Sequence, residues 1–574
     1  MKRTAWRIVL GAALAGWAVW SVGCASSGGH GGDANATDGV PGGMPAYGAL
    51  GSPQLFDEMG AYTRKVTTTS PEAQRYFDQG LNWLFSFNHD EAVLSFRRAA
   101  ELDPGCAMAW WGIAYAQGPN YNDPFMTPAR WASAWEATQR AVAALDDETP
   151  VERALVGTLG VRYAAEPPED ASPLNRAFAE AMGRLGQRYP DDAEIATLHA
   201  DALMVLHPWE LYRADGTPAR EQTNEIVRSL ERVLARFPEH PGANHLYIHA
   251  IEPSNDKARA IPAADRLSDL VPASGHMRHM PAHIYVQVGM WDRAIEQSYK
   301  AMAADAAYRK LSPEQIIQHG YMSHNSHMLA FAAMMVGREE EAMAAAQAMW
   351  DDFPPEMMQM AAPFIDGTMI AKHDVLKRFG RWEAIVASDP PPDYFPMTRA
   401  IFHGHKAVAH AALGDFESAE AEQQIFREKM AAQPVGWDYG YRMKVLLVTE
   451  FFVDAEIALQ RGEIERAIGL LEEAAAVEDL IGYGEPPQYL QPVRHTLGVA
   501  HLKNGDYASA ARVYQEDLDR WPGNGWSLLG LSQALAGLGD EDGAQAARER
   551  FEKAWHLADE MATSSCKCVE MAGE

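Results

Sequence analysis

Residues 73–106 read AQRYFDQGLNWLFSFNHDEAVLSFRRAAELDPGC, and this stretch decides the fold. From about Pro71 onwards the apolar residues recur with the period of an α-helix, which predicts helices in this part of the chain. Numbered from Ala73, the characteristic residues are Gly80 at position 8, Ala92 at 20, Phe96 at 24, Ala99 at 27 and Pro104 at 32. The stretch therefore combines a helical period with small residues, an aromatic ring and a proline at defined positions.

The same positions recur near the end of the chain. A unit that starts at Gln491 has Leu497 at position 7, Gly498 at 8, Ala510 at 20, Tyr514 at 24 and Pro522 at 32, and another unit starts at Gly525. This pattern resembles the tetratricopeptide repeat, a helix–turn–helix unit of about 34 residues. In that family the two helices cross at positions 8 and 20, where a large side chain would hold them apart. Weaker units are marked by alanine at position 20, namely Ala260, Ala294, Ala342, Ala384, Ala419 and Ala467.

The resemblance covers most of residues 71–558 and implies an all-α superhelical solenoid of roughly 10–13 helical hairpins. Insertions rich in proline, glycine, asparagine and aspartate interrupt the period. In a solenoid such insertions tend to cluster on one face, often the binding face. They are residues 118–128, 207–218, 389–396 and 481–492.

The N-terminal residues have the composition of an export signal, with a basic segment followed by an apolar run. Ser21-Val22-Gly23-Cys24 resembles the lipobox of bacterial lipoproteins, whose cysteine is lipidated. We therefore expect export, a lipid anchor at Cys24 in a bacterial envelope membrane and a periplasmic body; the alternative is a plain secretory signal. The predicted parts are a signal peptide (1–24), a flexible Gly/Ser-rich tether (25–60), the solenoid (61–560) and a disordered tail (561–574).

Charge limits the partners of the body. The formal net charge is −29 and the isoelectric point is about 5.1. A negative field of this size repels nucleic acid and anionic lipid, and it favours cations. We therefore expect no nucleic-acid partner, and contact with a membrane only through the N-terminal lipid.

Histidines are concentrated between residues 245 and 327, and their spacing follows the repeat. His245 and His249 recur 34 residues later as His279 and His283, and each pair is spaced i,i+4, so that it shares one helix face. In the repeat numbering the whole set falls at positions 2, 5, 9 and 12, within a narrow arc of the first helix of three units. The set is His245, His249, His276, His279, His283, His324, His327 and Glu252.

In the tetratricopeptide family this arc lines the concave groove where ligands bind, so the resemblance implies seven imidazoles and one carboxylate in one patch. Imidazole is the commonest protein ligand for transition metals, and histidines at i,i+4 can chelate one ion. We therefore expect a divalent transition metal (zinc, copper or iron), with Glu252 as a ligand or a general base. Seven imidazoles exceed the needs of one ion, which allows two ions or a spare base.

Three functions stay open from the sequence. The leading hypothesis is a binding protein whose groove holds a metal, a partner ligand (a protein, peptide or small molecule), or both. The second is a metal-dependent enzyme of unknown reaction that uses the same cluster, with Glu252 as the candidate base. The third is a metal-free adaptor for protein–protein contacts in envelope assembly. Motifs of other enzyme classes, such as GxSxG and GxxxxGK[ST], are absent from the sequence.

Overall fold

In the computed structural model, which describes residues 46–436 and 438–567, the stretch 73–106 forms two helices. The first, α2 (Pro71–Phe85), begins after Ser70, whose side chain accepts a hydrogen bond from the backbone N–H of Ala73. Pro71 takes the first helical position, where no N–H is needed. The second, α3 (His89–Leu102), begins after Asn88, whose side chain caps it in the same way. Local capping therefore sets where both helices start.

The helices of one unit cross where the sequence has small residues. A Cβ atom on Gly80 would lie 2.7 Å from the ring of Phe96, and a Cβ atom on Gly498 would lie 2.3 Å from the ring of Tyr514. The next unit contributes as well, since a Cβ atom on Gly112 would lie 2.6 Å from the ring of Phe96. The aromatic side chain at position 24 thus fills the space that these glycines leave, which explains the recurrence of glycine here.

The other helices continue this alternation in the described residues. In the first half they are α4 (Ala107–Gln117), α5 (Pro128–Ala143), α6 (Pro150–Arg162), α7 (Ser172–Arg188), α8 (Ala193–Met204), α9 (Glu221–Arg236), α10 (Pro241–Ile251), α11 (Ile261–Leu267), α12 (Gly275–Gln287) and α13 (Trp291–Leu311). Then follow α14 (Ile316–Met335), α15 (Glu339–Asp351), α16 (Pro355–Ile365), α17 (Ala371–Arg378), α18 (Trp382–Ala387), α19 (Pro396–Ala412), α20 (Phe416–Ala431), α21 (Tyr439–Gln460), α22 (Ile464–Asp479), α23 (Val493–Lys503), α24 (Tyr507–Arg520), α25 (Gly525–Gly537) and α26 (Glu541–Ala554).

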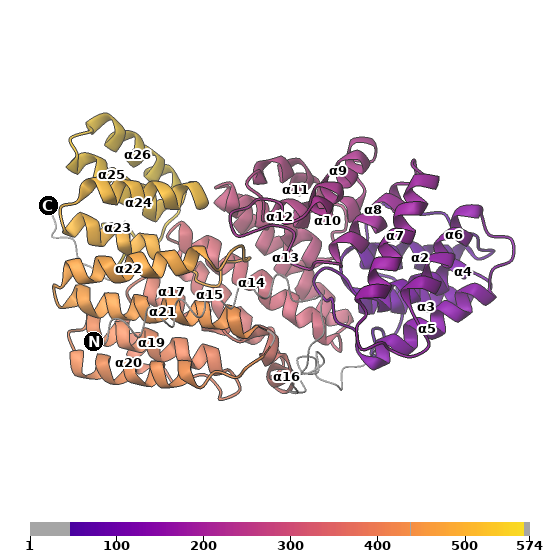
Figure 1. The fold of residues 1–574 in the computed structure, drawn as a ribbon, viewed down its shortest axis with the longest axis horizontal. Coiled ribbons are helices and arrows are strands. Elements are labelled where there is room, and N and C mark those ends of the chain that lie inside the picture. The colour runs from indigo at the N-terminus through magenta and orange to yellow at the C-terminus, as the bar shows by residue number, and fades with distance from the viewer. Residues whose placement is uncertain (1–45, 437, 568–574) are drawn as a thin grey trace, which may run out of the picture. The chain divides into compact units, whose positions relative to one another are not determined.

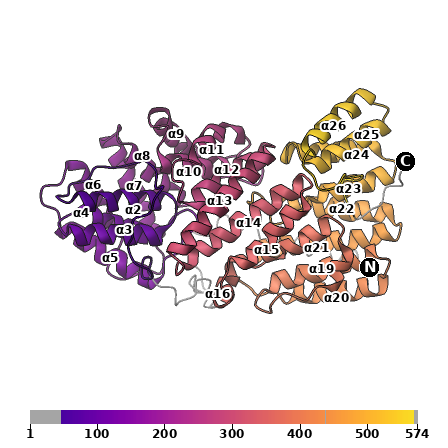
Figure 2. The same cartoon turned by 180° about the vertical axis from the view of Figure 1, so that it is seen from behind.

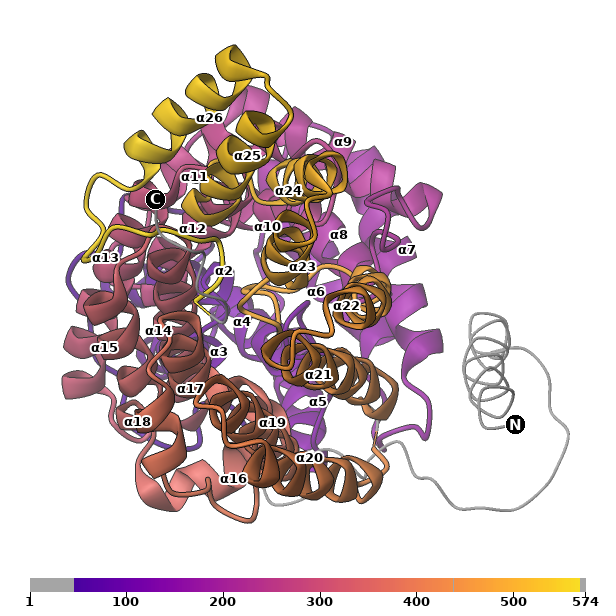
Figure 3. The same ribbon diagram turned by 90° about the vertical axis from the view of Figure 1, so that its left-hand side faces the viewer.

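These helices form twelve consecutive pairs, with α16 inserted between two of them, and the described residues contain no named β-strand. Successive pairs pack side by side in chain order (Figure 1), and α21 to α25 follow a curve when seen end-on (Figure 3). The predicted all-α solenoid and the predicted range of hairpins are thereby confirmed. None of the described helices combines the length and the apolar character needed to cross a lipid bilayer.

Two terminal segments that the composition predicted to be flexible lie against the helices. In residues 46–60 Tyr47 is buried, and the side-chain amide of Gln54 donates to the last carbonyl of α13. In residues 561–567 Ser565 is buried and donates from its hydroxyl to the backbone of α23. Specific hydrogen bonds, which composition does not reveal, therefore extend the packed body at both ends. The signal peptide with Cys24, residues 25–45 of the predicted tether and residues 568–574 of the predicted tail lie outside the described residues.

Candidate metal centre

Three neighbouring helices, α10, α12 and α14, carry the histidines that the sequence singled out. α12 packs against both of the others, as the view from behind shows (Figure 2). The histidines come together in two triads with one pattern, in which positions 5 and 9 of one unit meet position 2 of the next. Two members of the second triad, His279 and His283, therefore lie 34 residues after their counterparts in the first triad, His245 and His249.

The α12–α14 triad consists of His279, His283 and His324. Its Nε2 atoms are 2.6 Å apart between His279 and His283, 2.9 Å between His279 and His324, and 3.3 Å between His283 and His324. A tetrahedral zinc ion with bonds of about 2.0–2.1 Å holds its ligand nitrogens roughly 3.3–3.4 Å apart. The three nitrogens therefore lie at least as close together as the ligands of one ion.

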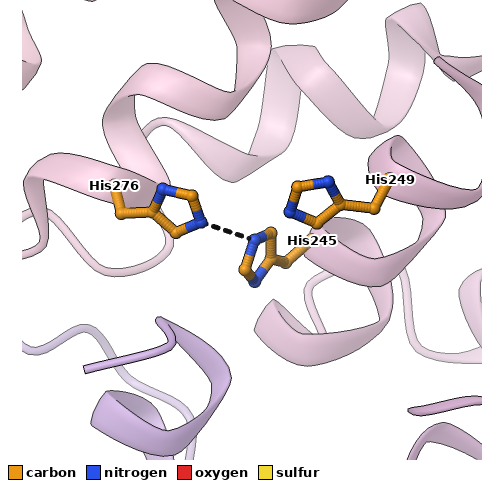
Figure 4. A group of neighbouring side chains, drawn as sticks. All are labelled: His245, His249 and His276. Atoms are coloured by element: carbon orange, nitrogen blue, oxygen red, sulfur yellow. Dashed lines mark hydrogen bonds between the residues drawn. The ribbon is translucent and has the colours of Figure 1, made fainter. Parts of the chain in front are cut away.

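The α10–α12 triad consists of His245, His249 and His276, whose rings face a common space between the two helices (Figure 4). One nitrogen of each lies within 4.8 Å of the others, and the Nε2 atoms of His245 and His276 are 3.0 Å apart. The Nδ1–H of His245 donates to the backbone carbonyl of Phe85 at 2.6 Å. That bond sets the tautomer of His245, because a carbonyl only accepts, and leaves its Nε2 lone pair directed at the triad.

Glu252 connects the two triads. One carboxylate oxygen accepts from Nδ1 of His249 and the other accepts from Nδ1 of His283, both at 2.8 Å. Glu485 adds a second carboxylate at 2.7 Å from Nδ1 of His283, and the hydroxyl of Tyr483 donates to Glu485 at 2.6 Å. Carboxylates commonly orient metal-binding histidines in this way, through the nitrogen that does not bind the ion. Glu252 thus orients one histidine of each triad.

Burial keeps most of the cluster neutral, because an imidazolium is costly to remove from water. It lowers the pKa of six histidines: His249, His324 and His327 to about 3, and His245, His276 and His279 well below the ordinary value. His283 is the exception. Burial lowers its pKa, but the neighbouring charges of Glu485 and Glu252 outweigh burial and raise the pKa to about 10. Neutral imidazole is the form that binds metal, and six of the seven are in that form near pH 7.

Phe87 covers the α10–α12 triad. Its ring centroid lies 4.5 Å from that of His245, 5.8 Å from His249 and 5.9 Å from His276. Its backbone φ is 55°, in the left-handed region that a non-glycine residue seldom adopts. Such strain persists only where surrounding contacts hold it, and it clusters at functional sites.

Three of the four insertions converge on the cluster. Tyr121, from residues 118–128, has its ring 5.4 Å from His249, and Trp209, from residues 207–218, lies 6.5 Å from Tyr121. Glu485 comes from residues 481–492. The clustering expected for insertions in a solenoid therefore holds for these three. The fourth insertion, residues 389–396, packs elsewhere, with Phe395 against Trp350.

His327 stands outside both triads, although its register matches that of His245 and His279. It is buried beside His324, whose pKa it helps to lower. Position 9 of its unit is Phe331 rather than a histidine, so a third triad is not completed. Among the histidines outside the cluster, His495 faces Asp517 at 2.9 Å.

Sequence reasoning missed Glu485, Phe87 and the carbonyl of Phe85. The insertion that contains Glu485 was the available signal, since it was expected on the binding face. Phe87 and the carbonyl of Phe85 belong to the first unit of the solenoid, and no spacing relates them to His245. Only the packing of α2 against α10 brings them to the triad.

The fold and the site define a helical-repeat protein with a buried histidine cluster between successive units. A tetratricopeptide-repeat family model matches residues 495–525. A "TPR repeat-containing protein" of Treponema pallidum (strain Nichols) is 31% identical over 130 residues, which cover 23% of this chain and 50% of that protein. Residues 495–525 of the chain thus resemble a tetratricopeptide repeat, and the match to the relative spans about half of that protein's length.

Several solved structures of helical-repeat proteins show a loose likeness. The human IFIT1 dimer with m7Gppp-AAAA has a TM-score of 0.30 and 11% identity, covering 86% of this chain and 92% of that one. The APC/C hetero-tetramer Cut9–Hcn1 has a TM-score of 0.27 and 11% identity, covering 84% and 76%. Yeast Tom70 has a TM-score of 0.26 and 13% identity, covering 84% and 93%.

Proposed function

We propose that this tetratricopeptide-repeat protein binds a divalent transition metal ion at the α12–α14 triad. The observation that carries the proposal is the mutual approach of three Nε2 atoms within 3.3 Å. If one of the three nitrogens carries a hydrogen, the other two still face each other with their lone pairs. A cation bound by all three nitrogens would satisfy them at once. It would replace the proton that His283 carries near pH 7 and take over its role in compensating the two carboxylates.

The donor set favours zinc, copper or iron. Imidazole nitrogen suits these ions, whereas calcium and magnesium require several oxygen ligands. The Nδ1–H of His283 is held by carboxylates and its Nε2 faces the other two rings, as in the carboxylate–histidine–metal arrangement. The donors that are present therefore fit such an ion. When bound, the ion would supply Lewis acidity or an attachment point for a ligand.

Three protein ligands leave a coordination position open, which favours an exchangeable ligand over a purely structural ion. Tetratricopeptide-repeat proteins generally bind protein or peptide partners, so a ligand held jointly by the groove and the ion is the functional reading that we prefer. The same open position is the observation that favours a metal-dependent enzyme as the second candidate. Both oxygens of Glu252 accept from histidines, so as a base Glu252 would have to release one of these hydrogen bonds.

Elemental analysis of the untagged full-length protein tests the metal proposal. We expect at least about one zinc, copper or iron per chain after desalting, because binding energies at buried multi-histidine sites resist dilution. Removal by a chelator at neutral pH and reloading with the free ion should restore that content. A content below about 0.1 per chain, also after reloading, would reject both metal-dependent functions and leave the adaptor.

We also propose that the protein is exported and anchored through lipid on Cys24, with its body in the periplasm. The support is the leader composition and the Ser21–Cys24 sequence, both outside the described residues. Cells fed labelled palmitate should incorporate label into the wild-type chain, and Cys24→Ser should lose the label and release the protein from the membrane fraction. A Cys24→Ser chain that remains labelled would show that the anchor is elsewhere.

A further inference from the structure

We propose that the α10–α12 triad is a second metal site and that the two sites are coupled through Glu252. The protein would then hold a pair of transition metal ions in one continuous cluster of six imidazoles. This inference rests on the proposed metal binding at the α12–α14 triad and adds the number of ions and the residue that links them.

The first support is that the two triads are built alike. Each triad combines positions 5 and 9 in the first helix of one unit with position 2 in the first helix of the next unit. Tandem units pack with the same relative geometry, so that side chains at equal positions meet in equal arrangements. A geometry that brings three nitrogens together once therefore brings them together again one unit earlier.

The second support is that lone pairs in the α10–α12 triad lack donors. Nε2 of His249 and Nδ1 of His276 have no hydrogen-bond partner in the described part of the chain, and both side chains are at least 97% buried. Because the Nδ1–H of His249 donates to Glu252, the unpaired Nε2 of His249 carries a lone pair. A buried acceptor without a partner destabilises the folded chain, because it has lost its hydrogen bonds to water. Nε2 of His276 faces His245 at 3.0 Å, so an ion ligated by His245, His249 and His276 would satisfy Nε2 of His249, whereas Nδ1 of His276 points away from the triad (Figure 4).

The third support is the enclosure of this triad. Phe87 stacks on His249 and His276 and lies tilted against His245, in a strained backbone conformation. Tyr121 closes the side of His249. Aromatic walls exclude water, which strengthens binding of an ion to neutral nitrogen donors.

Glu252 provides the coupling. Its two oxygens orient His249 in one triad and His283 in the other, and it is 2% exposed. An ion in either triad fixes the position of this carboxylate. The carboxylate then holds His249 or His283 of the other triad in the tautomer that binds metal. The neighbouring rings of the two triads lie close together, with centroids 6.2 Å apart for His249 and His283. Glu252 is therefore a positioning residue for two sites and not a ligand of either.

The test is a titration of the chelator-stripped, untagged full-length protein with Zn²⁺ by calorimetry, followed by elemental analysis. The wild-type chain should hold two ions. His276→Asn and, independently, His245→Gln should each reduce the content to one. His327→Asn is the matched control, because it removes a buried histidine on α14 that belongs to neither triad, and it should retain two ions.

Glu252→Gln should weaken both sites by about 10–100-fold, as expected for a residue that orients ligands. In the Co²⁺-loaded protein it should also change the visible absorption of both ions, a signature that a merely structural role would leave unaltered. Circular dichroism of each variant confirms that it has folded.

The possible outcomes separate this inference from the proposed function. A wild-type content of one ion that is retained in both α10–α12 variants would overturn the second site and leave the proposed function standing. No ion in the wild-type chain would overturn both. Two ions of which only one weakens in Glu252→Gln would overturn the coupling.

Discussion

Replacing His279 and His283 together by alanine is expected to abolish metal binding at the α12–α14 triad. The change removes two of the three nitrogens that converge there and leaves His324 as the only imidazole. Loss of an orienting residue already costs about 10–100-fold in metal affinity, so loss of two ligands should lower the affinity by more than about 100-fold. Calorimetric titration with Zn²⁺ and metal content after desalting measure the effect.

The matched control removes two histidines from another helix. His403 and His410 lie on α19, outside both triads, and pair with Glu422 and Asp415. His403→Ala/His410→Ala should leave metal content at the wild-type level. If the His279/His283 variant loses no ion relative to the wild-type chain and its affinities are unchanged, the α12–α14 triad is not a metal site. If that variant binds no metal because the helices have unfolded, the ion has a structural role.

Replacing Asp517 by alanine is expected to cause the largest loss of stability. Asp517 lies on α24, is 1% exposed, and its Oδ2 accepts from His495 at 2.9 Å, from Asn524 at 3.0 Å and from Ser527 at 2.6 Å. Alanine would remove the acceptor of His495 and Ser527 and one of the two acceptors of the Asn524 amide, at a cost of about 3–5 kcal/mol in the free energy of unfolding. Urea denaturation followed by circular dichroism measures the change.

The effect of Asp517 should depend on pH. Burial raises its pKa, but His495 and the hydrogen bonds from Ser527 and Asn524 outweigh burial, so that the pKa lies below the ordinary value of 3.8. A carboxyl group whose folded pKa is depressed contributes its stability above the unfolded pKa and loses it as the pH falls through the folded pKa. The difference between wild type and Asp517→Ala should therefore be full at pH 6–7 and shrink below about pH 4. A difference that grows on acidification would contradict this account.

The sequence alone determined the class of fold and the helix faces that carry the histidines. Glycine at position 8 of the first and penultimate units predicted a close crossing of the two helices of a unit. The structure shows that the ring of Phe96 fills the space at Gly80. The 34-residue recurrence of His245 and His249 placed equal side chains on equal faces of neighbouring helices. These features are local or periodic, and in a helix the spacing of residues directly determines the face on which their side chains lie.

Only the tertiary structure decided how the histidines divide and what orients them. The division into triads, in which positions 5 and 9 of one unit meet position 2 of the next, depends on the offset between packed helices, and the position within a unit does not give that offset. The carbonyl of Phe85 reaches His245 across 160 residues of chain. Glu485 reaches His283 from an insertion between α22 and α23. Contacts of this range arise from the packing of whole elements, and a single sequence contains no periodic signal for them.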